Sequence, residues 1–384
     1  MKTNYLLKND GGGLCKVFFA PDKITFLSIL LLALLSCHKE KTILKLGNEN
    51  TSPQLKSLDT AAVSFNGGVF HFSTFQNMEI AATYLDSLSD INRIGIETTL
   101  GFTSLKTIYD SLHSRIDTIS TENRLTEFLS SQSSYLVDIN DQIEMSYPFS
   151  FFHSIADYDG IFVVDSTVCR IMKNGIFAWR GSSVTQIRQL NIDDSITEDF
   201  AAGKFYIAKI SKSSVGCGNY QRAESRNDDN TRKVRLSIEV WRYGWFWQIC
   251  NPTQVLKYWM DYRTTVLVEG FKKNIWGKWI HYKTNLQFKE VYTECYIPTI
   301  TGFNDLNCTN YFNLQLVGGL YNKNKQKENT RELRVNYIGP IEDMGHTISC
   351  PFTNPIPEPI FNKVQGKAKS TGTNNNWAMI NCGY

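Results

Sequence analysis

The sequence predicts an α+β protein, with a small N-terminal helical region and a short β-meander followed by a mainly antiparallel, β-sandwich-like domain. Two observations lead to this fold class. Apolar residues recur every three or four positions between residues 74 and 129, which is typical of amphipathic helices. From about residue 158 the apolar period changes to two, and Gly, Asn and Pro separate short strand-like runs, which indicates antiparallel β structure.

Composition bounds the class of protein. A chain of 384 residues suggests two or three domains, and 42% hydrophobic with 20% charged residues excludes a disordered chain. Lys and Arg total 40 against 37 Asp and Glu, which leaves a net charge of +3. Because a dedicated nucleic-acid binder normally carries a strong basic excess, we expect no nucleic-acid partner.

The N-terminus has the features of an export signal. Residues 24–35 are apolar and follow Lys23. As a helix this run would span about 18 Å, too short for a hydrocarbon core of about 30 Å, and it fits the central region of a signal peptide. Residues 34–37, Leu-Leu-Ser-Cys, resemble a bacterial lipobox, so we expect cleavage before Cys37 and a lipid on its thiol. The alternative is an ordinary signal peptide with a coincidental cysteine.

The chain divides into five segments by pattern. Residues 38–60 are polar and lack sustained periodicity, and the stretch around 211–232 is rich in Ser, Gly, Asn, Asp and Arg. We therefore expect a signal peptide over 1–37, a tether over 38–60, an N-terminal α+β domain over 61–212, a linker over 213–232 and a C-terminal aromatic-rich β domain over 233–384.

Three helices and a short strand precede the meander. Val69–Phe72 reads as the strand. Thr74 can cap a helix that runs to about Leu88, Ser104 can cap a second helix, and Thr121 can cap a third, because each hydroxyl residue directly precedes an apolar pattern of helical spacing.

The β elements follow in order. Strands over 160–164, 168–172 and 176–179 form the meander, with Asn174-Gly175 as a hairpin turn, and 205–210 adds a further strand. In the C-terminal half we expect strands over 234–247, 264–269, 278–292, 313–317, 332–337 and 346–352.

Nine cysteines are present, and removal of Cys15 and lipidation of Cys37 leave seven. An exported protein can form disulfides, and an odd number leaves one thiol unpaired. Cys169 lies in an apolar strand pattern and is expected to be free and buried. Cys295 with Cys308, and Cys350 with Cys382, are candidate pairs on proximity alone, and other pairings stay open. The spacing of Cys and His fits no zinc site, so no metal is expected.

Aromatic residues supply the best functional lead. Six of the eight Trp lie within residues 241–279. In the strand from residue 234 the even positions are apolar and the odd positions begin with polar residues. If the period holds, the odd face continues as an exposed row, which would bind a glycan or a partner protein. The row consists of Trp241, Tyr243, Trp245 and Trp247. A bulge at Gly244 or a covering helical domain would bury it instead.

Catalytic motifs are missing from the sequence. It contains no Gly-x-Ser-x-Gly, no His-Glu-x-x-His, no P-loop and no Gly-x-Gly-x-x-Gly, so no cofactor is expected. The acidic residues within 193–199 could bind Ca²⁺, but they lack the spacing of a calcium loop and are better interpreted as solvated. Whether the chain is an enzyme stays open, and the sequence favours a protein without catalytic activity.

Short motifs carry a family resemblance. They are the lipobox, Gly68–Phe72, Leu100–Leu105, the meander from Asp159, and the C-terminal stretch Trp377–Cys382. Together they resemble uncharacterised outer-membrane lipoproteins of Bacteroidota that carry a domain of unknown function. The resemblance implies an outer-membrane lipoprotein and supplies no catalytic residues.

The resulting hypothesis is a lipid-anchored protein of the cell envelope that binds a glycan or an envelope protein without catalysis. Its membrane contact would be the lipid on Cys37. Two alternatives remain open: a hydrolase with dispersed catalytic residues, and a structural subunit of an envelope assembly.

Overall fold

The structure is a computed structural model that describes residues 63–383, except 192, 194–195, 210–212, 214–215, 250–254, 305–308, 322–323, 339–342, 349–355 and 373. All of these residues belong to one compact unit, which spans Leu44–Tyr384. The predicted signal peptide, the tether and Cys37 lie outside the described residues.

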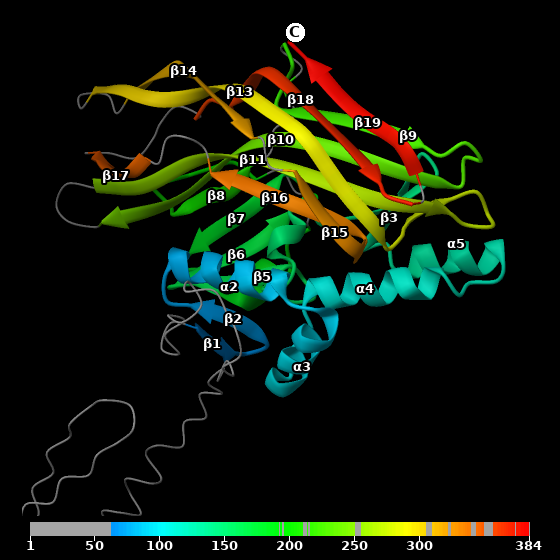
Figure 1. The fold of residues 1–384 in the computed structure, drawn as a ribbon. Coiled ribbons are helices and arrows are strands. Elements are labelled where there is room, and N and C mark those ends of the chain that lie inside the picture. The colour runs from blue at the N-terminus through cyan, green and yellow to red at the C-terminus, as the bar shows by residue number, and fades with distance from the viewer. Residues whose placement is uncertain are drawn as a thin grey trace, which may run out of the picture. The chain divides into compact units, whose positions relative to one another are not determined.

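A large mixed sheet forms the centre of the described fold (Figure 1). Its order is β1-β2-β5-β6-β7-β8-β10-β11-β12-β4-β3, with β9 beside β10 and both β16 and β17 beside β11. The strands are β1 (Val63–Asn66), β2 (Val69–Phe72), β3 (Leu136–Ile139), β4 (Gln142–Met145), β5 (Ile161–Val164), β6 (Thr167–Met172), β7 (Gly175–Arg180), β8 (Lys204–Lys209), β9 (Tyr220–Arg226), β10 (Arg232–Ile249), β11 (Val255–Lys273), β12 (Trp279–His281), β16 (Glu332–Ile338) and β17 (Asp343–Ile348).

A second sheet stacks on the large one. Its order is β14-β13-β18-β19, with β15 also paired to β13. The strands are β13 (Thr284–Asn304), β14 (Thr309–Tyr321), β15 (Lys325–Thr330), β18 (Ile360–Ser370) and β19 (Asn374–Cys382). Gly366 marks the contact between the sheets, because a Cβ there would lie only 2.9 Å from Ile238 of β10. The close approach allows the apolar even-numbered face of β10 to pack directly against β18.

Helices α2 (Phe75–Ser87), α3 (Asp90–Leu100), α4 (Leu105–Ile116) and α5 (Glu122–Ser131) lie on the opposite side of the large sheet (Figure 1). The 3₁₀ turn is η2 (Ser150–Phe152). Helix α6 (Val184–Arg188) lies on the other face of β5, where its Ile187 packs with Ile161 and Val163. The three predicted caps are confirmed, because the hydroxyls of Thr74, Ser104 and Thr121 accept hydrogen bonds from amides three residues later. Among the described helices, none combines the length and apolar character needed to cross a membrane.

The predicted α+β division is wrong, and the described fold is mostly β. Helices α2–α5 are inserted between β2 and β3, which are both strands of the large sheet. The helices have no separate core of their own, because their apolar sides pack against strands far along the chain. Phe75 of α2, for example, contacts Tyr243 and Trp245 of β10.

The predicted linker does not separate two compact units. Residues 213–232 contain β9, which pairs with β10 from Lys233↔Arg226 to Glu239↔Tyr220. Strand β9 is polar along its length, so its composition resembled a linker, while its backbone hydrogen bonds place it in the sheet.

The structure revises the cysteine pairing. Cys217 and Cys382 form a disulfide across 165 residues of sequence, and the described cysteines Cys169 and Cys295 are free and buried. The expectation for Cys169 is therefore confirmed. The proposed pairs are wrong for Cys382, whose partner is Cys217, and for Cys295. Cys308 and Cys350 lie outside the described residues.

Proximity in sequence predicted the wrong disulfide partners because the fold brings distant segments together. The Phe361 amide at the start of β18 donates to the Gly218 carbonyl at 2.6 Å, which holds the segment around Cys217 beside this strand. Cys382 lies on β19, opposite Val364 of that same strand β18.

Candidate functional site

The predicted aromatic row is buried. Trp241, Tyr243 and Trp245 are 3%, 0% and 2% exposed, and the side chain of Trp247 lies outside the described part of the structure. The predicted exposure is therefore wrong for these three residues.

Helix α2 and the η2 region cover this row. The Phe75 ring centroid lies 5.2 Å from Trp245, and Phe149 lies 5.4 Å from Trp241. Aromatic contacts of this kind are typical of a packed core. The row therefore anchors the helices to the sheet, and it presents no surface for a ligand.

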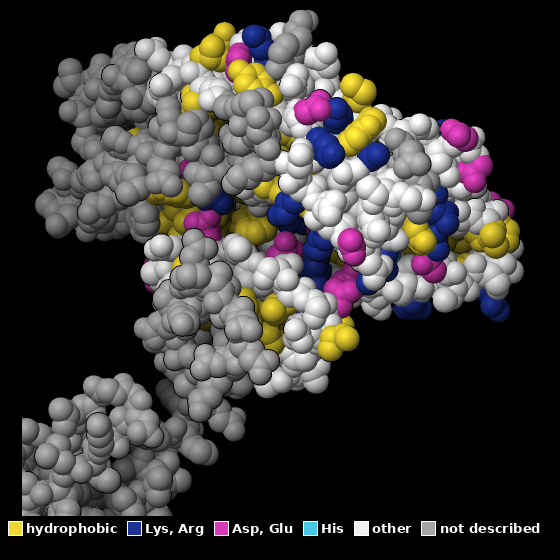
Figure 2. Space-filling model, in the orientation of Figure 1, with side chains coloured by type: hydrophobic (Ala, Val, Ile, Leu, Met, Phe, Trp, Pro, Cys, Tyr) yellow, Lys and Arg dark blue, Asp and Glu magenta, His cyan; other side chains and the backbone are white. Residues whose placement is uncertain are grey.

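A cleft of about 930 Å³ opens farther along the same face of the sheet. It lies between helices α2–α4 and the strands β11, β15 and β16, and charged side chains of both signs gather in this hollow (Figure 2). The charged lining residues are Glu79, Asp86, Asp90, Lys106, Asp110, Arg263, Lys283, Lys325, Lys327, Glu328, Arg331, Glu332 and Arg334.

The helix wall comes from three consecutive helices. Asp86 lies in the last turn of α2 and Asp90 in the first turn of α3. Lys106 and Asp110 are four residues apart on α4, so they share one face of that helix. The start of α4 is held by Ser104, whose hydroxyl caps the helix and donates to Glu97 at 2.6 Å.

The strand wall comes from a segment that changes sheets. Strand β15 pairs with β13 in the second sheet, whereas β16 pairs with β11 in the large sheet. The crossing occurs at Arg331, whose carbonyl accepts a hydrogen bond from the Gly270 amide at 3.0 Å. Because side chains alternate along a strand, Glu332, Arg334 and Asn336 then share the face that lines the cleft.

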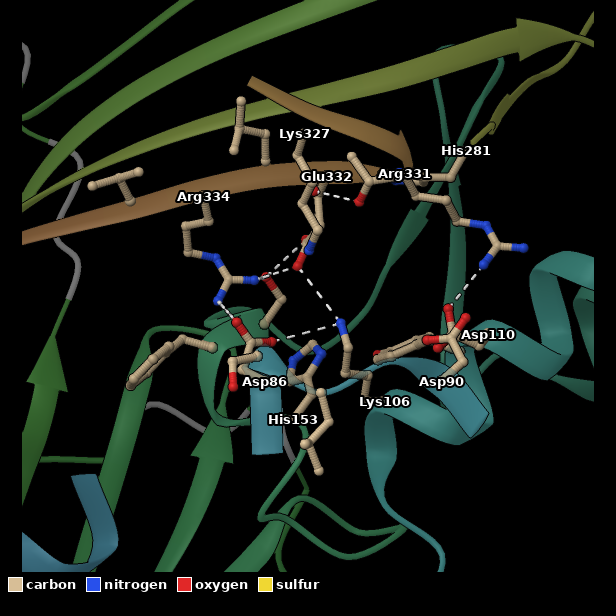
Figure 3. Close-up of a pocket in the computed structure, with 18 of the residues that line it drawn as sticks. Asp86, Asp90, Lys106, Asp110, His153, His281, Lys327, Arg331, Glu332 and Arg334 are labelled. Atoms are coloured by element: carbon tan, nitrogen blue, oxygen red, sulfur yellow. Dashed lines mark hydrogen bonds and ion pairs between the residues drawn. The ribbon is translucent and has the colours of Figure 1, made fainter. Parts of the chain in front are cut away.

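An ionic network occupies the centre of the cleft (Figure 3). Arg334 binds both Glu332 and Ser150, and its Nη1 lies 3.8 Å from Asp86. The Lys106 ammonium lies 3.7 Å from Asp86 and 3.8 Å from Glu332. These Lys106 distances exceed hydrogen-bond length, so its three N–H donors keep capacity for a ligand.

A second set of pairs lies toward the mouth. Arg331 donates to Asp110 at 2.9 Å, and Lys283 donates to Asp90 at 3.1 Å. Asp110 also accepts from buried Arg93 at 2.7 Å. The Nε of Arg331 and the Nη1 of Arg334 are buried without a hydrogen-bond partner among the described residues. A buried donor of this kind is costly unless a water or a ligand accepts from it.

Glu332 and three histidines in and beside the cleft have shifted pKa values. Burial would raise the pKa of Glu332, but Arg334 and Lys106 outweigh it and hold that pKa at about 2. Burial lowers the pKa of His153 to about 3. Its hydrogen bond to the Pro148 carbonyl, at 3.0 Å, raises the pKa but only partly offsets burial. Burial also lowers the pKa of His113 and of His281. Glu332 is therefore ionised at pH 7, and the imidazoles of His153, His113 and His281 are neutral.

The acidic residues considered for Ca²⁺ take part in ion pairs. Asp193 pairs with Lys173 at 3.0 Å, and Glu198 pairs with buried Arg242 at 2.5 Å. Within the described residues, no group of three or more His, Cys, Asp or Glu side chains is arranged to hold a metal ion.

Sequence reasoning did not find the cleft. Its residues come from α2, α3, α4 and the β15–β16 segment, and more than 200 positions separate Lys106 from Arg331. No short motif links them. The one local signal is the alternation of Glu332, Arg334 and Asn336 on a strand whose other face packs inward at Leu333.

Comparison with known proteins identifies a similar solved structure but no matching family profile. No family profile matches the chain, and no curated protein matches it significantly. Among solved structures, the crystal structure of a DUF4848 family protein from Bacteroides thetaiotaomicron is similar, with a TM-score of 0.25 and 10% sequence identity. The match covers 82% of this chain and 97% of that protein.

Proposed function

We propose that the chain is a non-catalytic binding module of the cell envelope that holds an oligosaccharide in the cleft between α2–α4 and the β15–β16 segment. The observation that carries this proposal is a cavity of about 930 Å³, lined by charges of both signs, in which buried arginine donors have no hydrogen-bond partner among the described residues. Ligand sites are typically concave, and a few placed polar groups set their specificity.

The chemistry of the walls suits a sugar. Carboxylates and cations that are already held in ion pairs present fixed acceptors and donors to ring hydroxyls, with little ordering cost on binding. Phe151 lines the same cavity and is half-buried, so part of its ring is available to the apolar face of a sugar. A protein partner would more often use a larger and flatter surface.

The cleft favours binding over hydrolysis. A glycosidase of the common type needs a carboxylic acid with a raised pKa to protonate the leaving group. The pKa of Glu332 is instead held at about 2, and Asp86 shares the same cations Lys106 and Arg334. Release of sugar products on incubation would replace this proposal with the hydrolase alternative.

The binding test is a glycan array probed with the full chain in detergent. Lys106→Met is expected to weaken binding of any array ligand by about tenfold or more, since it removes charge-assisted hydrogen bonds. The matched control is Lys173→Met, an exposed lysine outside the cleft. Silence on the array, or equal binding by the Lys106 variant, would reject the cleft as an oligosaccharide site.

The location is part of the same proposal: the chain is an outer-membrane lipoprotein anchored through Cys37. The short apolar run and the lipobox-like Leu-Leu-Ser-Cys support it. In a bacterial host, labelling with an alkyne palmitate is expected to mark the wild-type chain and to leave Cys37→Ala unlabelled. Equal labelling of the two chains would contradict the anchor, and Cys169→Ala, which changes a buried free thiol, is the control.

A further inference from the structure

Two lysines lie at the mouth of the cleft, on the same strand as the carboxylate of Glu328. Lys325 and Lys327 are exposed on β15 and form no ion pair with the described residues. They lie opposite Phe288 and Leu286 on β13, so both side chains leave the same face of the strand, and both line the cleft. Two like charges this close repel each other, and a bound negative group would relieve that repulsion.

Inside the cleft three cationic side chains keep donors without a hydrogen-bond partner among the described residues. Arg331 Nε and Arg334 Nη1 have no hydrogen-bond partner among the described residues, and Lys106 sits beyond hydrogen-bond length from its two carboxylates. The carboxylates Asp110 and Glu332, in contrast, each accept hydrogen bonds from arginine side chains. The group missing from this site is therefore rich in acceptors.

Lys106 and Arg331 line the same cleft from opposite walls. The Lys106 ammonium reaches in from the helix wall and the Arg331 guanidinium reaches in from the strand wall (Figure 3). Their own carboxylate partners, Asp86 and Asp110, belong to the helix wall. A ligand group between the two cations would meet charge from both walls at once.

We propose that the ligand of this cleft is an acidic oligosaccharide, with one carboxylate or sulfate seated between Lys106 and Arg331 and a further negative group held by Lys325 and Lys327. This inference rests on the proposed function and adds the substrate class. Neutral glycans would leave the guanidinium donors and the lysine pair without an anionic partner, so they bind more weakly.

The experiment uses probes in matched pairs. The full chain is titrated calorimetrically with tetragalacturonate and its methyl ester, and with a chondroitin sulfate tetrasaccharide and its desulfated form, alongside maltotetraose. At least one acidic probe is expected to bind about tenfold or more tighter than its matched partner, with affinity that falls as salt rises. Preference within the tetragalacturonate pair assigns a carboxylate site, and preference within the chondroitin pair assigns a sulfate site.

A double variant tests what the two lysines at the mouth of the cleft contribute to binding. The double change Lys325→Ser with Lys327→Ser is expected to weaken binding of the acidic probe severalfold and to reduce its salt dependence. The matched control is Lys367→Ser with Lys369→Ser, two lysines at the same spacing on β18, outside the cleft. This control is expected to keep wild-type affinity and salt dependence.

The outcomes distinguish the two proposals. If tetragalacturonate binds no tighter than its methyl ester, and sulfated chondroitin no tighter than its desulfated form, which keeps its carboxylates, the acidic class is overturned while the oligosaccharide site stands. Equal weakening by the mouth variant and the β18 control would also overturn it. If every glycan on the array and every titrated probe fails to bind, both the site and its ligand class fall.

Discussion

Trp245→Ala is expected to lower the free energy of unfolding by about 3–5 kcal/mol, the usual cost of emptying a buried site of this size. The side chain is 2% exposed, and its ring packs 5.2 Å from Phe75 and 5.5 Å from Phe205. Truncation leaves a cavity between α2 and β10 that the surrounding strands can only partly fill.

Urea unfolding of the two proteins measures this cost. Met379→Ala is the matched control, because Met379 is 66% exposed on β19 and its truncation should change the free energy by no more than about 0.5 kcal/mol. A loss below about 1 kcal/mol for Trp245→Ala would contradict the packing described for the aromatic row. Trp245 does not line the cleft, so variant protein that is still folded should retain the ligand affinity of the wild type.

The second large expected effect is a loss of folding stability at acidic pH. His153 is buried, and its pKa falls from 6.5 to about 3 in the folded chain. The unfolded chain therefore binds the extra proton first, and the stability contributed by neutral His153 is full above pH 6.5 and is lost as the pH falls toward 3. Between pH 7 and pH 5 this single group is expected to cost about 2 kcal/mol of unfolding free energy.

Other groups titrate nearby, so the test is a difference between two proteins. Burial raises the pKa of Glu239 to about 7, which acts in the opposite direction because its proton stabilises the fold as the pH falls. Glu332 contributes only below pH 4.5, on the way to its lowered pKa of about 2. The charged side chains that act on His153 are Glu332, Arg334 and Lys106.

His153→Gln isolates the effect. Glutamine keeps a donor for the Pro148 carbonyl and carries no titrating proton. The variant is expected to lose about 2 kcal/mol less than the wild type between pH 7 and pH 5, measured by urea unfolding at each pH. His71→Gln is the control, because His71 is only partly buried and should show a smaller difference. Parallel curves for wild type and His153→Gln would refute the assignment.

Local elements were predictable where local chemistry decides them. Thr74, Ser104 and Thr121 cap helices at the expected positions, since a hydroxyl can accept from an amide three residues on whatever the distant fold does. The burial of Cys169 followed from the apolar strand pattern around it, and every residue of β6 is buried. Helix α3 was missed because its pattern is weakly apolar, and Ser89 and Gly101 set its ends.

Contacts between segments that are distant in sequence could not be predicted from local patterns. The two-residue period correctly placed Trp241, Tyr243 and Trp245 on one face of β10, but it could not say that α2 covers that face. Proximity in sequence likewise could not place Cys217 beside Cys382.

The sequence by itself determined the helix caps and the alternation along the strands, because each depends on neighbours within a few residues. The tertiary structure alone decided which face of the sheet is covered, which cysteines meet and where charge collects. Lys106 and Arg331 line one cleft only because α4 packs on the large sheet and the chain changes sheets at Arg331. Burial and electrostatic pairing depend on distance in space, and a linear pattern does not contain that distance.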